Sequence, residues 1–101
     1  PLVFPNPWSI KSVNLSVGFV LSYASDIQIQ IYDMFGHLMY KKDFIAGLTG
    51  KTSMGRNLIE ISPEDFRYFD ISAGVYFLIL IGENNQVLGK TKFAIIPDAL
   101  N

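Results

Sequence analysis

Alternation of apolar and polar residues with a period of two constrains this chain more than any other feature. In residues 13–21 nearly every second residue is large and apolar, and in residues 27–31 isoleucine alternates with glutamine. Successive side chains of a β-strand point to opposite faces of its sheet, so a strand of this kind buries one face and solvates the other. Both segments are predicted to be half-buried antiparallel strands, joined by a turn at residues 23–26.

The chain reverses direction after the second predicted strand. Gly36 suits a tight turn because glycine adopts positive φ at low cost. Residues 37–44 are predicted to return as a strand, and their charged residues indicate an edge strand protected against aggregation. A hairpin turn is predicted at residues 83–86. The remaining strands are predicted at residues 58–61, 75–81 and 86–96, the second of them central because it is apolar on both faces.

One segment favours a helix. Ser62 is a good N-cap, Pro63 suits the first helical position, and Glu64 and Asp65 favour the positive end of the helix dipole. The chain is therefore predicted to be all-β: an Ig-like antiparallel β-sandwich of about seven strands with one short helix near residues 63–69. Residues 1–101 are expected to form a single domain.

Composition excludes several classes of protein. Half of the 101 residues are hydrophobic and 17% are charged, so the chain is too apolar to be disordered. A formal net charge of −1 argues against a nucleic-acid partner. The longest apolar run, residues 75–81, is far shorter than the roughly 18–20 residues of a membrane helix. The absence of cysteine excludes a disulfide framework and thiolate metal sites.

The chain begins Pro-Leu-Val-Phe, with neither an initiator methionine nor a signal-peptide pattern. We therefore expect it to be a module cut from a longer protein. A short protein that has lost its initiator methionine is the alternative.

No segment carries the pattern of a catalytic or cofactor site. Residues 47–52 (GLTGKT) have only two residues between the glycines, whereas a phosphate-binding loop needs four and a helix directly after them. His37 is the sole histidine, so neither a zinc site nor a triad is expected. The nine acidic residues are scattered, and only a calcium site in a turn stays open. The chain is predicted to bind no cofactor and not to be an enzyme.

Aromatic residues make up 14% of the chain. They favour core and corner positions, since tyrosine often buries its ring and leaves its hydroxyl at the rim. A sugar-stacking strip is the alternative, and its members would be Trp8, Tyr23, Tyr32, Tyr40, Tyr68 and Tyr76.

Four stretches, in order along almost the whole chain, carry a family resemblance. They are residues 4–8 (FPNPW), 27–36 (IQIQIYDMFG), 72–77 (SAGVYF) and 90–96 (KTKFAII). In this respect the chain resembles the C-terminal Ig-like sorting domains of type IX secretion and their relatives with the flagellar hook-cap Ig-like fold. A helix-forming insertion at residues 62–70 and a tail at residues 97–101 depart from the family pattern.

The resemblance assigns roles to particular residues. Pro5, Asn6 and Pro7 would hold an extended segment before the first strands. Structural motif positions would also be Tyr32, Asp33, Gly36, Gly74 and Tyr76, with Gly36 permitting the reversal and Tyr76 reaching a partner at a corner. The last strand and its edge would be the recognition element, through Lys90, Lys92, Phe93, Ile95 and Ile96.

The resemblance implies a non-catalytic C-terminal module, from the C-terminal part of a larger secreted bacterial protein. It would direct the secretion and cell-surface placement of that protein, which passes through the periplasm. Its partners would be the secretion machinery or domains of the parent protein. An accessory carbohydrate-binding or adhesion module, with polysaccharide as its partner, is the alternative, as is a structural spacer of a secreted enzyme.

Overall fold

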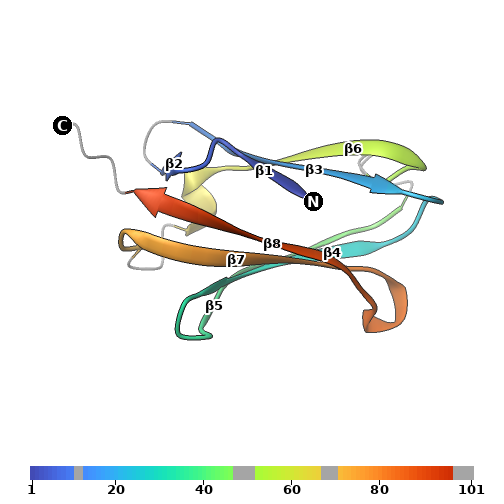
Figure 1. The fold of residues 1–101 in the computed structure, drawn as a ribbon. Helices are drawn as coiled ribbons and strands as arrows, with labels where there is room; N and C mark the ends of the chain where they lie inside the picture. The colour runs from blue at the N-terminus through green and yellow to red at the C-terminus, as the bar shows by residue number, and fades with distance from the viewer. Residues whose placement is uncertain (11–12, 47–51, 67–70, 97–101) are drawn as a thin grey trace.

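Two β-sheets packed face to face make up the fold (Figure 1). The computed structural model describes residues 1–10, 13–46, 52–66 and 71–96. The smaller sheet has the order β1-β3-β6, formed by β1 (Leu2–Phe4), β3 (Leu15–Leu21) and β6 (Gly55–Ile61). The larger has the order β2-β8-β7-β4-β5, formed by β2 (Trp8–Ser9), β8 (Val87–Ile96), β7 (Gly74–Ile81), β4 (Ile27–Asp33) and β5 (Leu38–Phe44).

The predicted all-β sandwich is confirmed, with eight strands in the described part of the chain rather than about seven. The additional strands are β1 and β2, which lie in the N-terminal segment that the sequence predicts to be extended. β7 lies in the middle of the larger sheet and β5 at its edge, as predicted. The hairpin turn before β8 is also confirmed, with Asn84 and Asn85 both at positive φ (59° and 58°).

The sheet to which a strand belongs does not follow its order in the sequence. β3 and β4 are consecutive, yet β3 pairs with β1 and β6 whereas β4 pairs with β5 and β7. The turn at residues 23–26 therefore carries the chain from one sheet to the other. The strand predicted at residues 58–61 is longer than expected, because pairing with β3 extends β6 back to Gly55.

Alternate side chains of the strands fill the space between the sheets. The pattern is clearest in β3, where Leu15 and Val17 are fully buried, and in β4, where Ile29 and Ile31 are. β7 and β8 contribute Leu78, Phe93 and Ile95 from the larger sheet. Each such side chain stabilises the fold by about 1.5–3 kcal/mol relative to an exposed position.

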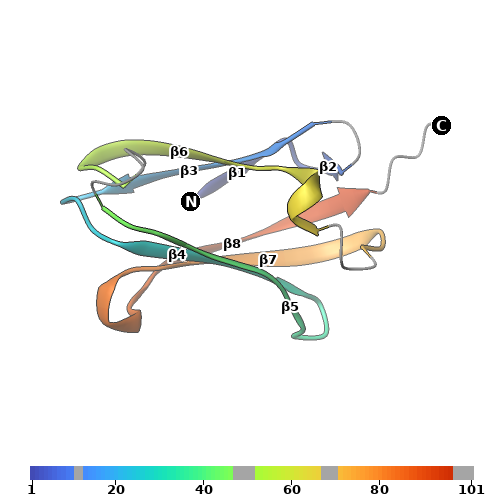
Figure 2. The ribbon, with the colours of Figure 1, turned by 180° about the vertical axis from the view of Figure 1, so that it is seen from behind.

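A short helix closes one end of the core. The predicted helix is a 3₁₀ turn, η1 (Pro63–Phe66), and residues 67–70 lie outside the described residues. Two side chains cap the start of this helix. The Ser62 hydroxyl accepts a hydrogen bond from the Glu64 N–H, and the Asp65 carboxylate accepts one from the Ser62 N–H. In Figure 2 this helix lies between β6 and β5.

The helix places one aromatic ring between two others. Phe66 makes an edge contact with the Trp8 ring, with centroids 5.6 Å apart, and stacks on Tyr40 at 5.5 Å. Trp8 is fully buried, and its indole N–H donates to the Val13 carbonyl at 2.8 Å. The rings thus join β2, β5 and η1 at this end of the sandwich.

Burial raises the pKa of Tyr40, and the nearby Asp65 carboxylate raises it further. The folded protein therefore keeps the phenol protonated at a pH where the unfolded chain loses the proton, and stability falls as the pH rises above about 10. We expect Tyr40→Phe to lose less stability than the unmodified chain between pH 9 and 11. Urea unfolding at both pH values measures this difference, and equal losses would contradict it.

Candidate functional site

The N-terminal segment crosses from the smaller sheet to the larger one. β1 pairs with β3, and after Pro5-Asn6-Pro7, whose two X-Pro peptide bonds are cis, β2 pairs in parallel with the end of β8. The Asn6 side-chain oxygen accepts a hydrogen bond from the Ala94 N–H at 2.9 Å. The segment is thus a crossover between sheets rather than a simple extended lead-in.

This crossover covers part of the edge of the last strand. Besides the Asn6–Ala94 contact, the Ile10 N–H donates to the Ile96 carbonyl at 3.3 Å, and Trp8 lies opposite Ile95. The backbone edge at residues 94–96 is therefore already paired within the domain. Sequence reasoning missed this pairing because the Ala94 N–H is a backbone group that leaves no signal in the residue type.

The residues predicted for recognition point in two directions. Phe93 and Ile95 are each 1% exposed and belong to the core, so their side chains are not accessible in the folded domain. Lys90 and Lys92 point outward and are exposed, and Ile96 is partly exposed. Of these five side chains, only Lys90, Lys92 and Ile96 are accessible from solvent.

The outer face of the larger sheet carries these lysines beside apolar side chains. Two rows cross the sheet: Lys41, Gln30, Ile79 and Lys90 form one, and Leu38, Tyr32, Phe77 and Lys92 form the other. A shallow groove runs between the side chains of β7 and β8, lined by Phe77, Ile79, Lys90, Thr91 and Lys92. We call this groove, together with the outward row that extends from it to Lys41, the lysine face.

A chain of hydrogen bonds fixes the neighbouring strand. The Tyr32 hydroxyl donates to the Gln30 side-chain oxygen at 2.7 Å, and the Gln30 amide donates to Gln28. The Gln28 amide in turn donates to the Asp43 carboxylate at 2.7 Å. Because these polar groups are satisfied by one another, the lysine face is bordered on this side by an ordered polar surface.

Asp33 organises the turn between β4 and β5. Its carboxylate accepts hydrogen bonds from the N–H groups of Phe35 at 2.9 Å and His37 at 2.8 Å, and its second oxygen lies 3.0 Å from the His37 ring nitrogen Nδ1. The Gly36 N–H donates to the Asp33 carbonyl, and Gly36 adopts φ +89°, as its predicted role requires. Desolvation raises the pKa of Asp33, but these hydrogen bonds outweigh it and hold that pKa below its usual value.

Most of the family-motif residues gather at one end of the sandwich, where β4 and β8 end and β7 begins (Figure 1). Tyr76 lies opposite Asp33 on the neighbouring strand, and Gly74 lies opposite Ile95. The Tyr76 hydroxyl donates to the Ser72 carbonyl at 2.8 Å, which ties the loop before β7 to the strand. The Asn6–Ala94 contact is at the same end.

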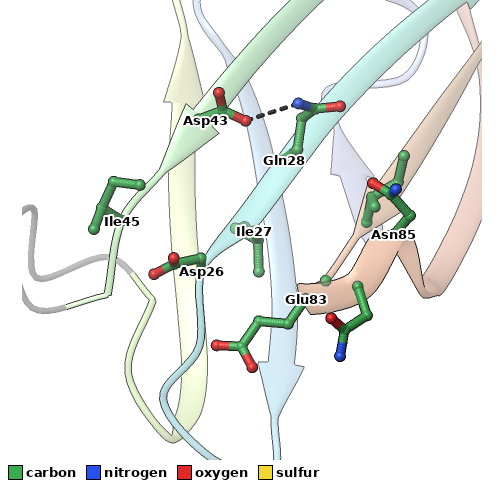
Figure 3. A pocket seen from close by; sticks show the side chains of 10 residues that line it. Asp26, Ile27, Gln28, Asp43, Ile45, Glu83 and Asn85 are labelled. Carbon is green, nitrogen blue, oxygen red and sulfur yellow. Dashed lines mark hydrogen bonds between the residues drawn. The ribbon is translucent and has the colours of Figure 1, made fainter.

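An acidic pocket lies at the opposite end of the larger sheet and bears on the predicted alternative of a calcium site (Figure 3). Asp26, Asp43 and Glu83 line it, but Asp43 is bonded to Gln28 and Asp26 accepts from the Ala46 N–H at 2.9 Å. Over the described ranges, no group of three potential ligands is close enough to hold a metal ion. The phosphate-loop-like residues 47–51 lie outside the described residues, and Thr52 is buried.

Among the described residues, the aromatic side chains proposed for sugar stacking do not share one exposed face. Trp8, Tyr40 and Tyr76 are buried in the core, which bears out the core interpretation for these three. Tyr23 is exposed in a turn, Tyr32 is half-buried on β4, and Tyr68 lies outside the described residues. In the part of the chain that the structure describes, no helix is long and apolar enough to span a membrane.

The described elements thus form an all-β sandwich with an N-terminal crossover between its two sheets and ordered turns at one end. Comparison with protein families then specifies the class: residues 2–95 match the model of the secretion system C-terminal sorting domain. The chain therefore belongs to the type IX secretion C-terminal sorting domain family. A search of curated proteins finds no match. The relationship to the hook-cap fold stays a prediction.

The Asp33 turn predicts a specific loss of stability in acid. Because the pKa of Asp33 is lowered on folding, its ionised form contributes stability above about pH 4 that is lost as the pH falls through the folded-state pKa. Asp33→Asn keeps a hydrogen-bond acceptor but has no charge. We expect it to be less stable than the unmodified chain in urea at pH 7, with the difference shrinking by pH 2.5. A difference that is equal at the two pH values would contradict this account.

Proposed function

We propose that this chain is a non-catalytic module that directs type IX-dependent export of a larger bacterial protein, which passes through the periplasm to the cell surface or the medium. The observation that carries the proposal is the family match over residues 2–95. The family is one of sorting domains, so the partner is the secretion machinery rather than a substrate. Membership in this family supports a secreted or cell-surface location for the parent protein.

We further propose that the machinery contacts the lysine face. Lys41, Lys90 and Lys92 lie on the outer surface of the larger sheet, in two rows that contain no acidic residue, and Asp43 lies opposite Gln28 in the adjacent row. The whole chain carries a net charge of −1, so positive charge is concentrated here rather than typical of the surface. Such a surface steers an acidic partner, while Phe77 and Ile79 supply apolar contact once it arrives.

The backbone edge of β8 contributes less to this proposal than its side chains do. Residues 94–96 are already paired with the N-terminal crossover, so a partner strand would have to displace it. Deleting residues 90–101 is expected to abolish export. It also removes the buried side chains of Phe93 and Ile95, so the deletion does not separate loss of recognition from loss of folding.

Charge reversal at the surface separates loss of recognition from loss of folding. Residues 1–101 are fused behind an exported monomeric reporter in a bacterium with a type IX system, and the reporter is measured in the periplasm, at the surface and in the medium. We expect the double variant Lys90→Glu/Lys92→Glu to lower translocon-dependent arrival outside the cell by about tenfold or more, since like charges at an interface cost several kcal/mol.

Arg56→Glu is the matched control, because Arg56 is exposed on β6 of the other sheet. Unchanged export of the lysine variant, with its folding verified by protease resistance, would reject the lysine face. Periplasmic retention of the unmodified fusion in its native host would reject the sorting function. Polysaccharide pulldown would then test the accessory-module alternative.

A further inference from the structure

Core packing does not account for the side chain at the tip of the β4–β5 hairpin. Phe35 is 79% exposed, the largest fraction among the large apolar residues described, and its neighbour Met34 is 58% exposed. The ring contact described for Phe35 is with the His37 ring, whose centroid is 6.4 Å away. Two adjacent large apolar side chains therefore face solvent on a short turn, where polar residues are the usual choice.

Hydrogen bonds hold the backbone of this turn in a defined conformation. The Asp33 carboxylate binds the N–H groups of Phe35 and His37, and the Asp33 carbonyl accepts from Gly36. The Asp33 N–H also donates to the His37 carbonyl at 3.0 Å. An aromatic side chain on an ordered turn loses little conformational entropy when it is bound, which is the property of an anchor residue in an interface.

The surroundings of the tip favour a protein pocket over a lipid surface. A tip that inserts into a membrane typically carries Lys or Arg beside its apolar residues, to meet anionic headgroups. Residues 31–40 contain no Lys or Arg, and the nearest charge is the Asp33 carboxylate. The tip also borders a small cleft with residues 72–76, among the motif residues at this end of the sandwich.

We propose that Met34 and Phe35 form the apolar anchor of a second contact, which inserts into an apolar pocket on a protein of the secretion machinery. This contact rests on the proposed function and adds to the lysine face. The lysine face supplies charge and steering, and the tip supplies apolar surface that is buried only in the complex. Burial of a phenylalanine of this kind is among the larger single contributions to an interface.

The reporter fusion tests the anchor with variants that leave the core untouched. We expect Phe35→Ala to lower translocon-dependent export by about tenfold or more, and Phe35→Leu to retain most of it because it keeps an apolar side chain. The matched control is Tyr23→Ala, since Tyr23 is 62% exposed and lies in the turn at the other end of β4. Thermal unfolding of each purified domain verifies that the fold is retained.

The outcomes separate this inference from the proposed function. If the unmodified fusion is exported and Phe35→Ala matches Tyr23→Ala, the anchor is rejected while the sorting function stands. If Phe35→Leu fails as completely as Phe35→Ala, an apolar anchor is also rejected. The remaining measurement is binding to vesicles of anionic phospholipid. If the unmodified domain binds them and Phe35→Ala does not, the anchor contacts a lipid surface and the proposed protein pocket is rejected. Loss of export in Phe35→Ala alone, without vesicle binding, supports the proposal.

Discussion

Burial of alternate side chains between the two sheets is the constraint on which the rest of this structure depends. Each strand contributes one face to a shared core, so the side chains on its other face are available to solvent or to a partner. β8 shows the consequence within a few residues: Phe93 and Ile95 hold the sheets together, while Lys90 and Lys92 stand on the outside. The core side chains and the side chains proposed for recognition therefore occupy alternate positions of the same strand.

Aromatic side chains and the N-terminal crossover close one end of the sandwich. There the Phe66 ring packs against the rings of Trp8 and Tyr40, which joins the N-terminal crossover to the larger sheet. The Asn6 side chain adds a hydrogen bond to the edge of β8, so this edge is paired at residues 94–96. The contacts proposed for a sorting machine therefore use the outward face of the sheet and the β4–β5 turn, rather than strand addition at residues 94–96.

Features that depend on neighbouring residues in the sequence were predicted correctly. The alternation in residues 15–21 and 27–31 gave the buried faces of β3 and β4, and the Gly36 turn and the central position of β7 were also predicted. Prediction from the sequence was less successful for the N-terminal segment, where two very short strands join different sheets. Strands of two or three residues have no periodicity to detect, and their pairing depends on partners far away in the chain.

Some features of the candidate site also follow from the sequence alone, whereas others depend on tertiary contacts. The amino-acid sequence by itself determined that the last strand has lysines on one face and apolar residues on the other, because side chains alternate along any strand. It also supplied the four motifs that indicated the sorting family. Only the tertiary structure decided that residues 94–96 are covered by the N-terminal crossover and that Phe77 and Ile79 lie beside the lysines. Those contacts join residues remote in sequence, and the register between strands is set by packing of the whole core rather than by any local pattern.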